Sequence, residues 1–379
     1  MNKENKILAN AVRFLSIDAV QKANSGHPGM PMGMADVATV LFKYHLRFNP
    51  KNPDWVNRDR FILSAGHGSM LLYSLLHLTG YESVSLEDIK NFRQLDSICA
   101  GHPEYKSGSG IETTTGPLGQ GLGNAVGMAI AEEILKKKFG SSLINNKTYV
   151  IASDGDLMEG ISHEAMSLAG HLKLKNLIVF FDNNKISIDG STSLSVSDNY
   201  KKRFEGYGWN FLEINGHNEK QISKAITKAS KANKPTLISC KTIIGFGSPN
   251  KSGKASSHGS PLGVEEIALV RKKLKWNNEP FQIPEDILNS WRTIGKKGIK
   301  LEEKWLETLN KKSSHIKSEL NKTYVESNLK NLEDLIKEEK VKYFDSKPSM
   351  ATRQCSSAVI ESISSILPQL IGGSAYTEP

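Results

Sequence analysis

The segment from Thr148 to Gly190 constrains the fold of this 379-residue chain more than any other. Two short apolar runs, 149–152 and 177–181, flank a stretch whose apolar residues recur at helical spacing: Ile161, Ala165, Leu168, Ala169 and Leu172. This pattern predicts a strand, a crossover helix and a second strand. Such a crossover is nearly always right-handed and joins parallel strands. We therefore expect Asp154 and Asn184, which each follow one strand, to lie at the same edge of the sheet.

That edge is where open α/β sheets bind their ligands. Asp154 offers a carboxylate oxygen and Asn184 an amide oxygen. Both are hard ligands suited to Mg²⁺, which prefers about six oxygens and takes some of them from a bound phosphate. Gly155 can bring a backbone N–H close to such a phosphate, beside the positive end of the following helix. The sequence thus predicts a site for a divalent cation and a phosphate.

Residues 1–265 repeat the same alternation of helical periodicity with short apolar runs, at 60–64, 210–214 and 236–242. The pattern predicts an α/β domain with a doubly wound, mainly parallel sheet that helices cover on both faces. Residues 266–346 are richer in Lys, Glu and Asn, and we interpret them as a helical, Lys-rich connector with a solvated face. In 347–379, a helix over 351–366 and a strand over 370–375 predict the start of a second α/β domain.

Composition excludes several classes of function. The net charge of +9 arises from 49 basic and 40 acidic residues, but the lysines are scattered and not interleaved with aromatic residues, so we expect no nucleic-acid partner. Cys99, Cys240 and Cys355 form no CxxC pair, which indicates neither a disulfide framework nor a zinc site. The N-terminus lacks the apolar core of a signal peptide, and no apolar run has spanning length. We expect a cytoplasmic protein without a membrane partner.

Four histidines stand in loops rich in Gly, Ser or Pro: His27, His67, His102 and His258. Taken alone, each of these histidines is best explained by a surface or structural role. Beside a phosphate site, however, such imidazoles can donate to an anion or transfer protons near neutral pH. A zinc site is the competing interpretation, although the histidines lack the spacing of zinc ligands.

The glycine-rich stretch 116–124, GPLGQGLGN, opens a strong helix. A dinucleotide-binding fingerprint fits it poorly, because no apolar strand precedes it and the G-x-G-x-x-G spacing fails at Asn124. We interpret this stretch as a backbone cradle for an aromatic or polar group of a cofactor.

Eight segments resemble the transketolase family, in matching order over essentially the whole chain. They are NSGHPGMPMGMA, LSAGHGSMLLY, FRQLDSICAGHPE, ETTTGPLGQGLGNAVGMA, SDGDLMEGISHEA, FDNNKISIDG, SHGSPLG and MATRQCSS. The resemblance implies the thiamine-diphosphate-binding fold, with thiamine diphosphate and Mg²⁺ as cofactors and Ca²⁺ or Mn²⁺ as substitutes for Mg²⁺.

The resemblance also implies roles for individual residues. The metal ligands would be Asp154, Asn184 and the backbone oxygen of Ile186. The cofactor would be held at its diphosphate by His67, Gly155 and His258 and at its aminopyrimidine by Gly116, Pro117 and Leu118, with Asn184 also in contact. His27, His102 and His258 would act on the substrate as catalytic residues, and His27, His258 and Arg353 would bind it, Arg353 at its phosphate. Glu159 would couple the two active sites of a dimer.

The implied reaction transfers a two-carbon ketol unit from a ketose phosphate to an aldose phosphate, in the pentose phosphate pathway. The chain departs from the family at Ser153, where glycine is usual, and after Ala375, where the family continues with Asp and a long further stretch. We therefore expect it to end early in the pyrimidine-binding domain, without the glutamate that protonates the aminopyrimidine. It would be inactive as a homodimer unless a C-terminal half complements it. The alternatives are a non-catalytic fragment that binds magnesium and thiamine diphosphate, and a truncated product without function.

Overall fold

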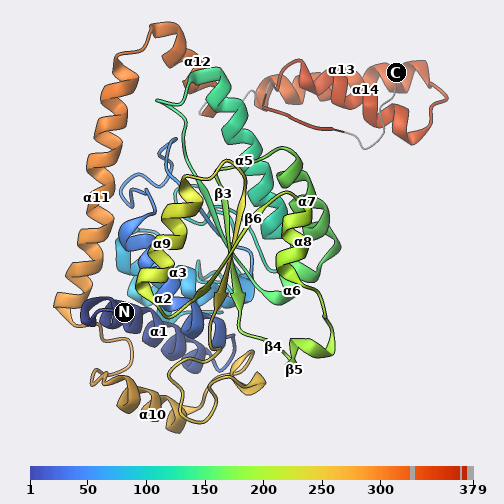
Figure 1. The fold of residues 1–379 in the computed structure, drawn as a ribbon. Helices are drawn as coiled ribbons and strands as arrows, with labels where there is room; N and C mark the ends of the chain where they lie inside the picture. Colours follow the sequence, from blue (N-terminus) through green and yellow to red (C-terminus); the bar gives the residue numbers. More distant parts are fainter. Residues whose placement is uncertain (325–328, 368, 374–379) are drawn as a thin grey trace. The chain divides into compact units, whose positions relative to one another are not determined.

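The computed structural model describes residues 1–324, 329–367 and 369–373, and the chain divides into two compact units, Met1–Leu306 and Glu307–Pro379. The first unit is built on a five-stranded sheet (Figure 1). Every pairing in this sheet is parallel. In spatial order its strands are β1 (Arg60–Leu63), β2 (Thr148–Ala152), β3 (Leu177–Asn183), β7 (Thr236–Lys241) and β6 (Asn210–Asn215). The predicted mainly parallel sheet is confirmed.

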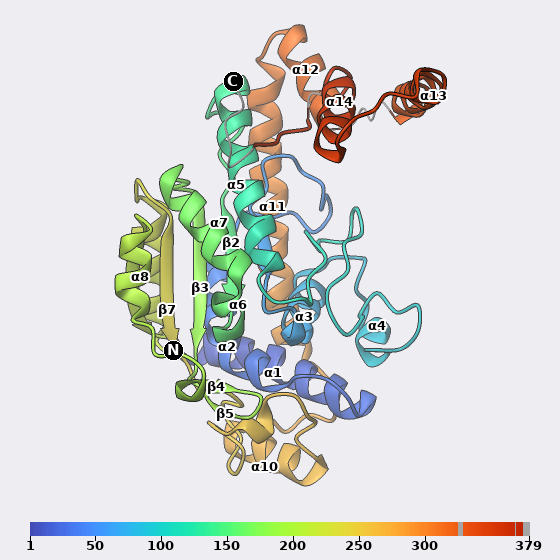
Figure 2. The same ribbon diagram turned by 90° about the vertical axis from the view of Figure 1, so that its right-hand side faces the viewer.

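Helices cover both faces of the sheet, because the side chains of each strand alternate between two apolar cores. Phe61, Ile151 and Phe180 belong to the first core, while Val150 and Val179 belong to the second. The helices of the first core include α1 (Lys3–Ala23), α2 (Gly29–Tyr44), α3 (Ser69–Thr79) and α9 (Glu219–Ser230). Those of the second include α5 (Gln120–Phe139), α6 (Asp154–Met158), α7 (Gly160–His171) and α8 (Tyr200–Gly206). Figure 1 views this sheet nearly edge-on, and Figure 2 turns the second face toward the viewer. The fold is therefore doubly wound, as predicted.

Local sequence signals set several of the helix ends. The Asn2 side chain accepts a hydrogen bond from the Asn5 N–H at the start of α1, and Asn24 ends that helix in a left-handed conformation. Gly140, at φ 87°, follows the Lys136–Lys138 turn at the end of α5. The remaining short elements of this unit are η1 (Gly66–Gly68), α4 (Leu86–Lys90), β4 (Ile186–Ser187), β5 (Gly190–Ser191), η2 (Thr192–Leu194), η3 (Ala255–Ser257) and α10 (Val264–Leu274).

Helix α11 (Glu285–Asn310) starts in the first unit and continues past its boundary. Its Trp291 is fully buried, and the indole N–H donates to the backbone oxygen of Leu8. The second unit contains α12 (Ser314–Tyr324), α13 (Leu329–Ser346) and α14 (Thr352–Ser364). In the parts of the chain that the structure describes, no helix is both long and apolar enough to cross a membrane.

The prediction of a strand over 370–375 is wrong for residues 370–373, which the structure describes. Residues 370–373 have no strand structure, and the Leu370 N–H instead closes a turn onto the Leu367 oxygen. A strand needs a neighbour for its backbone hydrogen bonds. The described elements of this unit are helices, and Gly372 and Gly373 weaken any strand. Residues 374–375 lie outside the described residues. The division into 1–265, 266–346 and 347–379 remains a prediction.

Candidate active site

A cavity of about 280 Å³ lies at the carboxyl edge of the parallel sheet. Asp154 follows β2 and Asn184 follows β3, so the two residues reach this edge from neighbouring strands. The structure brings together around the cavity ten residues that the sequence analysis singled out. They are His27, His67, His102, Gly116, Leu118, Asp154, Gly155, Asn184, Ile186 and His258. Residues more than 200 positions apart in the sequence therefore share one site.

Two buried carboxyl groups line the cavity. Asp154 is 5% exposed and Asp182 is 1% exposed. Burial and the neighbouring Asp182 raise the pKa of Asp154 to about 7, and burial raises the pKa of Asp182 to about 6. Two negative charges in a poorly solvated place are costly. The pair is therefore stabilised either when one carboxyl group keeps its proton or when a cation binds.

The two carboxyl groups differ in their hydrogen bonds. Both oxygens of Asp182 are engaged, Oδ1 by the Thr242 hydroxyl and Oδ2 by the Asn184 amide at 2.8 Å. The Oδ1 atom of Asp154 is buried and has no partner with the geometry of a hydrogen bond, although the Tyr200 hydroxyl lies close enough to lower the pKa of this carboxyl group. Asp154 therefore presents a free, desolvated oxygen toward which a cation can be drawn.

Asn184 is held in place at both ends of its side chain. Its amide N–H donates to Asp182, and its Oδ1 accepts from the Ile186 N–H at 2.9 Å. These two bonds fix the turn that leads into the β4–β5 hairpin. Among the residues that the structure describes, no three His, Cys, Asp or Glu side chains gather as metal ligands. A cation at this edge would rely on carboxylate, amide and backbone oxygens together.

Three imidazole rings pack against one another beside this edge. The ring centroid of His27 lies 5.1 Å from that of His67 and 5.6 Å from that of His258, and the His67 and His258 centroids are 5.2 Å apart. Burial and the neighbouring His258 lower the pKa of His27 to about 4 and that of His67 to about 3. Burial also lowers the pKa of His258 and, together with Arg93, that of His102. At neutral pH these rings are uncharged, so each has one donor and one acceptor nitrogen.

The glycine-rich stretch approaches these histidines through its backbone. Gly116 has φ +148°, and a Cβ added there would lie 3.2 Å from Cγ of His102. Gly119, at φ +83°, donates its N–H to Oδ1 of Asp156 at 2.8 Å. A larger residue at either position would strain the backbone or crowd its neighbour. The stretch lies against the cavity with its main chain, as a cradle requires.

Three predicted site residues do not line the cavity. Pro117 is exposed between Gly116 and Leu118. Glu159 is exposed between α6 and α7, with its Cβ 3.0 Å from where a Cβ on Gly119 would lie. Arg353 is exposed on α14, in the second unit. The roles of these residues stay predictions.

Sequence reasoning missed two buried acids. Asp182 directly follows the apolar run 177–181. Its position in the sequence FDNN could have indicated a place near the sheet edge. Asp156 accepts from the Ser64 hydroxyl at 3.0 Å and from the Gly119 N–H, joining three segments of the site. It also forms a capping box with Ser153, the residue that departs from the family pattern. The capping box could have been predicted from the sequence, because its two residues are three positions apart. The contacts of Asp156 with Ser64 and Gly119 could not.

Comparisons with known proteins show the family of this chain. Residues 4–329 match the family described as "Transketolase, thiamine diphosphate binding domain". The transketolase of Rhodobacter capsulatus is 51% identical over 368 residues, covering 97% of this chain and 55% of the relative. That of Buchnera aphidicola subsp. Acyrthosiphon pisum is 54% identical over 383 residues, covering 99% of this chain and 57% of the relative.

A crystal structure of transketolase from Campylobacter jejuni superposes with a TM-score of 0.83 at 48% identity, covering 86% of this chain and 51% of that chain. The chain thus spans about half the length of the relatives it matches. Over that span, the sequence and the fold agree. The chain belongs to the transketolase family and contains its thiamine diphosphate binding domain.

Proposed function

We propose that this chain supplies the diphosphate- and metal-binding half of a transketolase active site. That site would transfer a two-carbon ketol unit from a ketose phosphate to an aldose phosphate. The observation that carries the proposal is the buried Asp154 Oδ1, which has no hydrogen-bond partner and lies at a cavity lined by four histidines. Family membership supports the reaction type.

The residues present fit the expected cofactor and cation. Asp154, Asn184 and the backbone oxygen of Ile186 come from adjacent segments of one sheet edge and offer oxygen atoms alone, which suits a hard cation such as Mg²⁺, with Ca²⁺ or Mn²⁺ as substitutes. His67, His258 and Gly155 would donate to the diphosphate. The backbone of Gly116 and the side chain of Leu118 would lie against the aminopyrimidine, next to Pro117.

Thiamine diphosphate, when bound, supplies the carbanion chemistry for breaking and forming the C–C bond. The protein's part is to bind, orient and exchange protons. The Nδ1 atoms of His27 and His258 are buried and have no hydrogen-bond partner in the protein. Because both rings are neutral, each can donate to a sugar oxygen or accept a proton from a sugar hydroxyl. His102, beside Gly116, would serve the same hydroxyl groups.

Complementation tests the proposal. The chain is mixed with Mg²⁺, thiamine diphosphate and a separately expressed C-terminal half of the Rhodobacter capsulatus transketolase, and ketol transfer from a ketose phosphate is measured. We expect turnover with both halves and none with either alone. His27→Ala should lower kcat on the order of 100-fold, whereas the exposed His315→Ala should leave it unchanged.

If the two halves bind each other and no turnover is measured, the catalytic proposal is refuted. That outcome would favour a non-catalytic binder of magnesium and thiamine diphosphate. The same assay with Arg353→Gln tests the proposed substrate-phosphate contact, which should appear as a higher KM. We also propose that the protein lies in the cytoplasm and acts in the pentose phosphate pathway. Family membership supports the pathway.

We further propose that a second copy, or the corresponding face of a complementing chain, packs on α5 and α7. On α7, Ile161 is 40% exposed and Leu168 is 46% exposed, and Ile134 on the adjacent α5 is 41% exposed. Glu159 is the N-cap residue that precedes α7 and lies with Ile161 beside Gly119, which supports its proposed role in coupling two sites.

Sedimentation velocity tests this interface. We expect the chain to sediment as a dimer at micromolar concentration, and we expect Leu168→Glu to make it a monomer because a charge would be buried. Leu269→Glu on α10, where leucine is similarly exposed at 40%, is the matched control and should remain dimeric. A monomeric wild-type chain would contradict self-association.

A further inference from the structure

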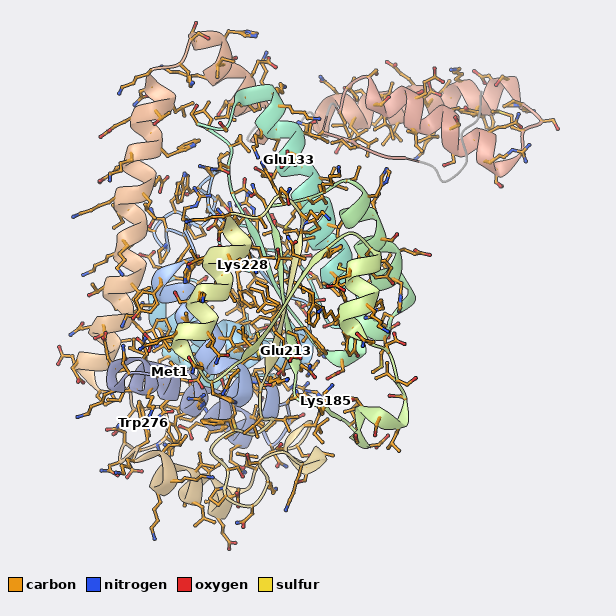
Figure 3. The ribbon with its side chains drawn as sticks, viewed as in Figure 1. Met1, Glu133, Lys185, Glu213, Lys228 and Trp276 are labelled. Carbon is orange, nitrogen blue, oxygen red and sulfur yellow. The ribbon has the colours of Figure 1, made fainter. Side chains whose placement is uncertain are left out.

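A second cavity, of about 500 Å³, lies in the first unit and shares no lining residue with the cofactor cavity. It is formed by the start of α1, the end of α10 and the loops that follow β6 and β7. Figure 3 labels Met1, which lines this cavity at the start of α1. The predicted chemistry of the family site does not use these residues.

The cavity has a basic rim. Lys3 and Lys6 come from the first turns of α1, where residues three apart share a face, and Lys273 and Lys275 come from the end of α10. All four are exposed.

The nearby acids are already engaged with other partners. Glu4 pairs with Lys43 at 2.6 Å, and Asp18 pairs with Arg271 at 2.6 Å. Glu219 accepts from the Asn2 N–H at 2.9 Å. Glu219 keeps its negative charge because a backbone N–H does not neutralise it, and the four lysines still leave the rim with a net positive charge.

The floor of the cavity is polar and rigid. The Arg13 side chain is 2% exposed, pairs with Asp36 at 2.7 Å and donates from Nε to the Met32 oxygen at 2.9 Å. His217 donates from Nδ1 to the same Asp36 at 2.8 Å, since its Nε2 accepts from the Ile243 N–H. The Phe246 ring stacks on His217 with centroids 4.1 Å apart. Each of these groups is fixed by the protein before any ligand arrives.

Apolar side chains complete the lining. Ile7 and Leu274 face the cavity together with Phe246. A volume of this size falls within the range of small-molecule sites, which commonly combine an apolar wall with a few fixed polar groups. A ligand here would find cations for an anionic group and an apolar wall for the remainder.

We propose that this cavity binds a phosphorylated small molecule. Its phosphate would lie among Lys3, Lys6, Lys273 and Lys275, whose ammonium groups are compact cations suited to phosphate oxygens. The organic part would lie against Ile7, Leu274 and Phe246. Of the charged groups that line the cavity, the four lysines and Arg13 are positive and only Asp36 is negative, which selects for an anion.

Methyl-selective NMR of the whole chain tests this with inorganic pyrophosphate as the probe. EDTA is present, so that no divalent cation can draw the probe to Asp154. Ile7 and Leu274 report on the second cavity, and Ile186 and Ile244 report on the cofactor cavity. We expect saturable shifts at Ile7 and Leu274, with a Kd at or below about 1 mM.

The double variant Lys6→Gln/Lys273→Gln should weaken this Kd at least tenfold. Lys228→Gln/Lys231→Gln, at residues that line a different surface hollow, removes the same charge and should change it less than twofold. Shifts confined to Ile186 and Ile244, or an equal loss of affinity in both double variants, would overturn the proposal. So would an unchanged Kd in Lys6→Gln/Lys273→Gln.

Discussion

Replacing Asp154 with alanine is expected to abolish magnesium-dependent binding of thiamine diphosphate, weakening it by on the order of 100-fold or more. Asp154 supplies a buried oxygen without a hydrogen-bond partner in the protein, whereas both oxygens of Asp182 are occupied by Thr242 and Asn184. A hard cation would therefore lose its charged ligand, and the remaining amide and backbone oxygens are neutral.

Calorimetric titration with thiamine diphosphate, with and without Mg²⁺, measures the effect. Asp286→Ala, at an exposed position in the first turn of α11, is the control and should bind like the wild type. Asp182→Asn should weaken binding less than Asp154→Ala, because it leaves the free oxygen of Asp154 in place. An unchanged affinity in Asp154→Ala would sink the assignment of the metal site.

Local pattern sufficed to place Asp154 and Asn184, because each lies within three residues after the end of an apolar run whose strand is parallel to the other. The same reasoning failed for Asp182. Strand β3 continues through Asp182 and Asn183, where these residues pair with Cys240 and Lys241 of β7. A polar residue inside a buried strand is stabilised there by a partner distant in sequence, here Thr242. No local signal contains that partner.

Helix α7 shows a second limit of periodicity. Its apolar residues recur at helical spacing, but Ala165 and Ala169 are buried while Leu168 and Leu172 are about half exposed. The close approach of α5 selects the small side chains for the inside and leaves the large ones outside. Arg93 shows a third limit. Its Nη1 donates to the Ser25 hydroxyl at 2.6 Å, and its backbone has φ 63°, a conformation that is uncommon for residues other than glycine and that the sequence does not indicate.

Asp154→Asn is expected to stabilise the cofactor-free chain at pH 8 by up to about 4 kcal/mol and to have little effect at pH 4. The folded state raises the pKa of Asp154 from 3.8 to about 7, so the folded chain holds a proton that the unfolded chain has released between these pH values. The stability that this group contributes is fully present below its unfolded pKa and is lost as pH rises through about 7. Asparagine resembles the protonated acid at every pH and avoids the cost of ionisation.

Urea unfolding of the wild type and of Asp154→Asn from pH 4 to pH 8 measures this difference in the free energy of unfolding. The comparison must be between variants, because His27 and His67 act in the opposite direction. Their pKa values are lowered on folding, so their contribution is lost as pH falls below about 6.5. That contribution is common to both chains and cancels in the difference. A difference that is independent of pH, or that Asp286→Asn reproduces, would show that folding does not raise the pKa of Asp154 and would contradict this prediction.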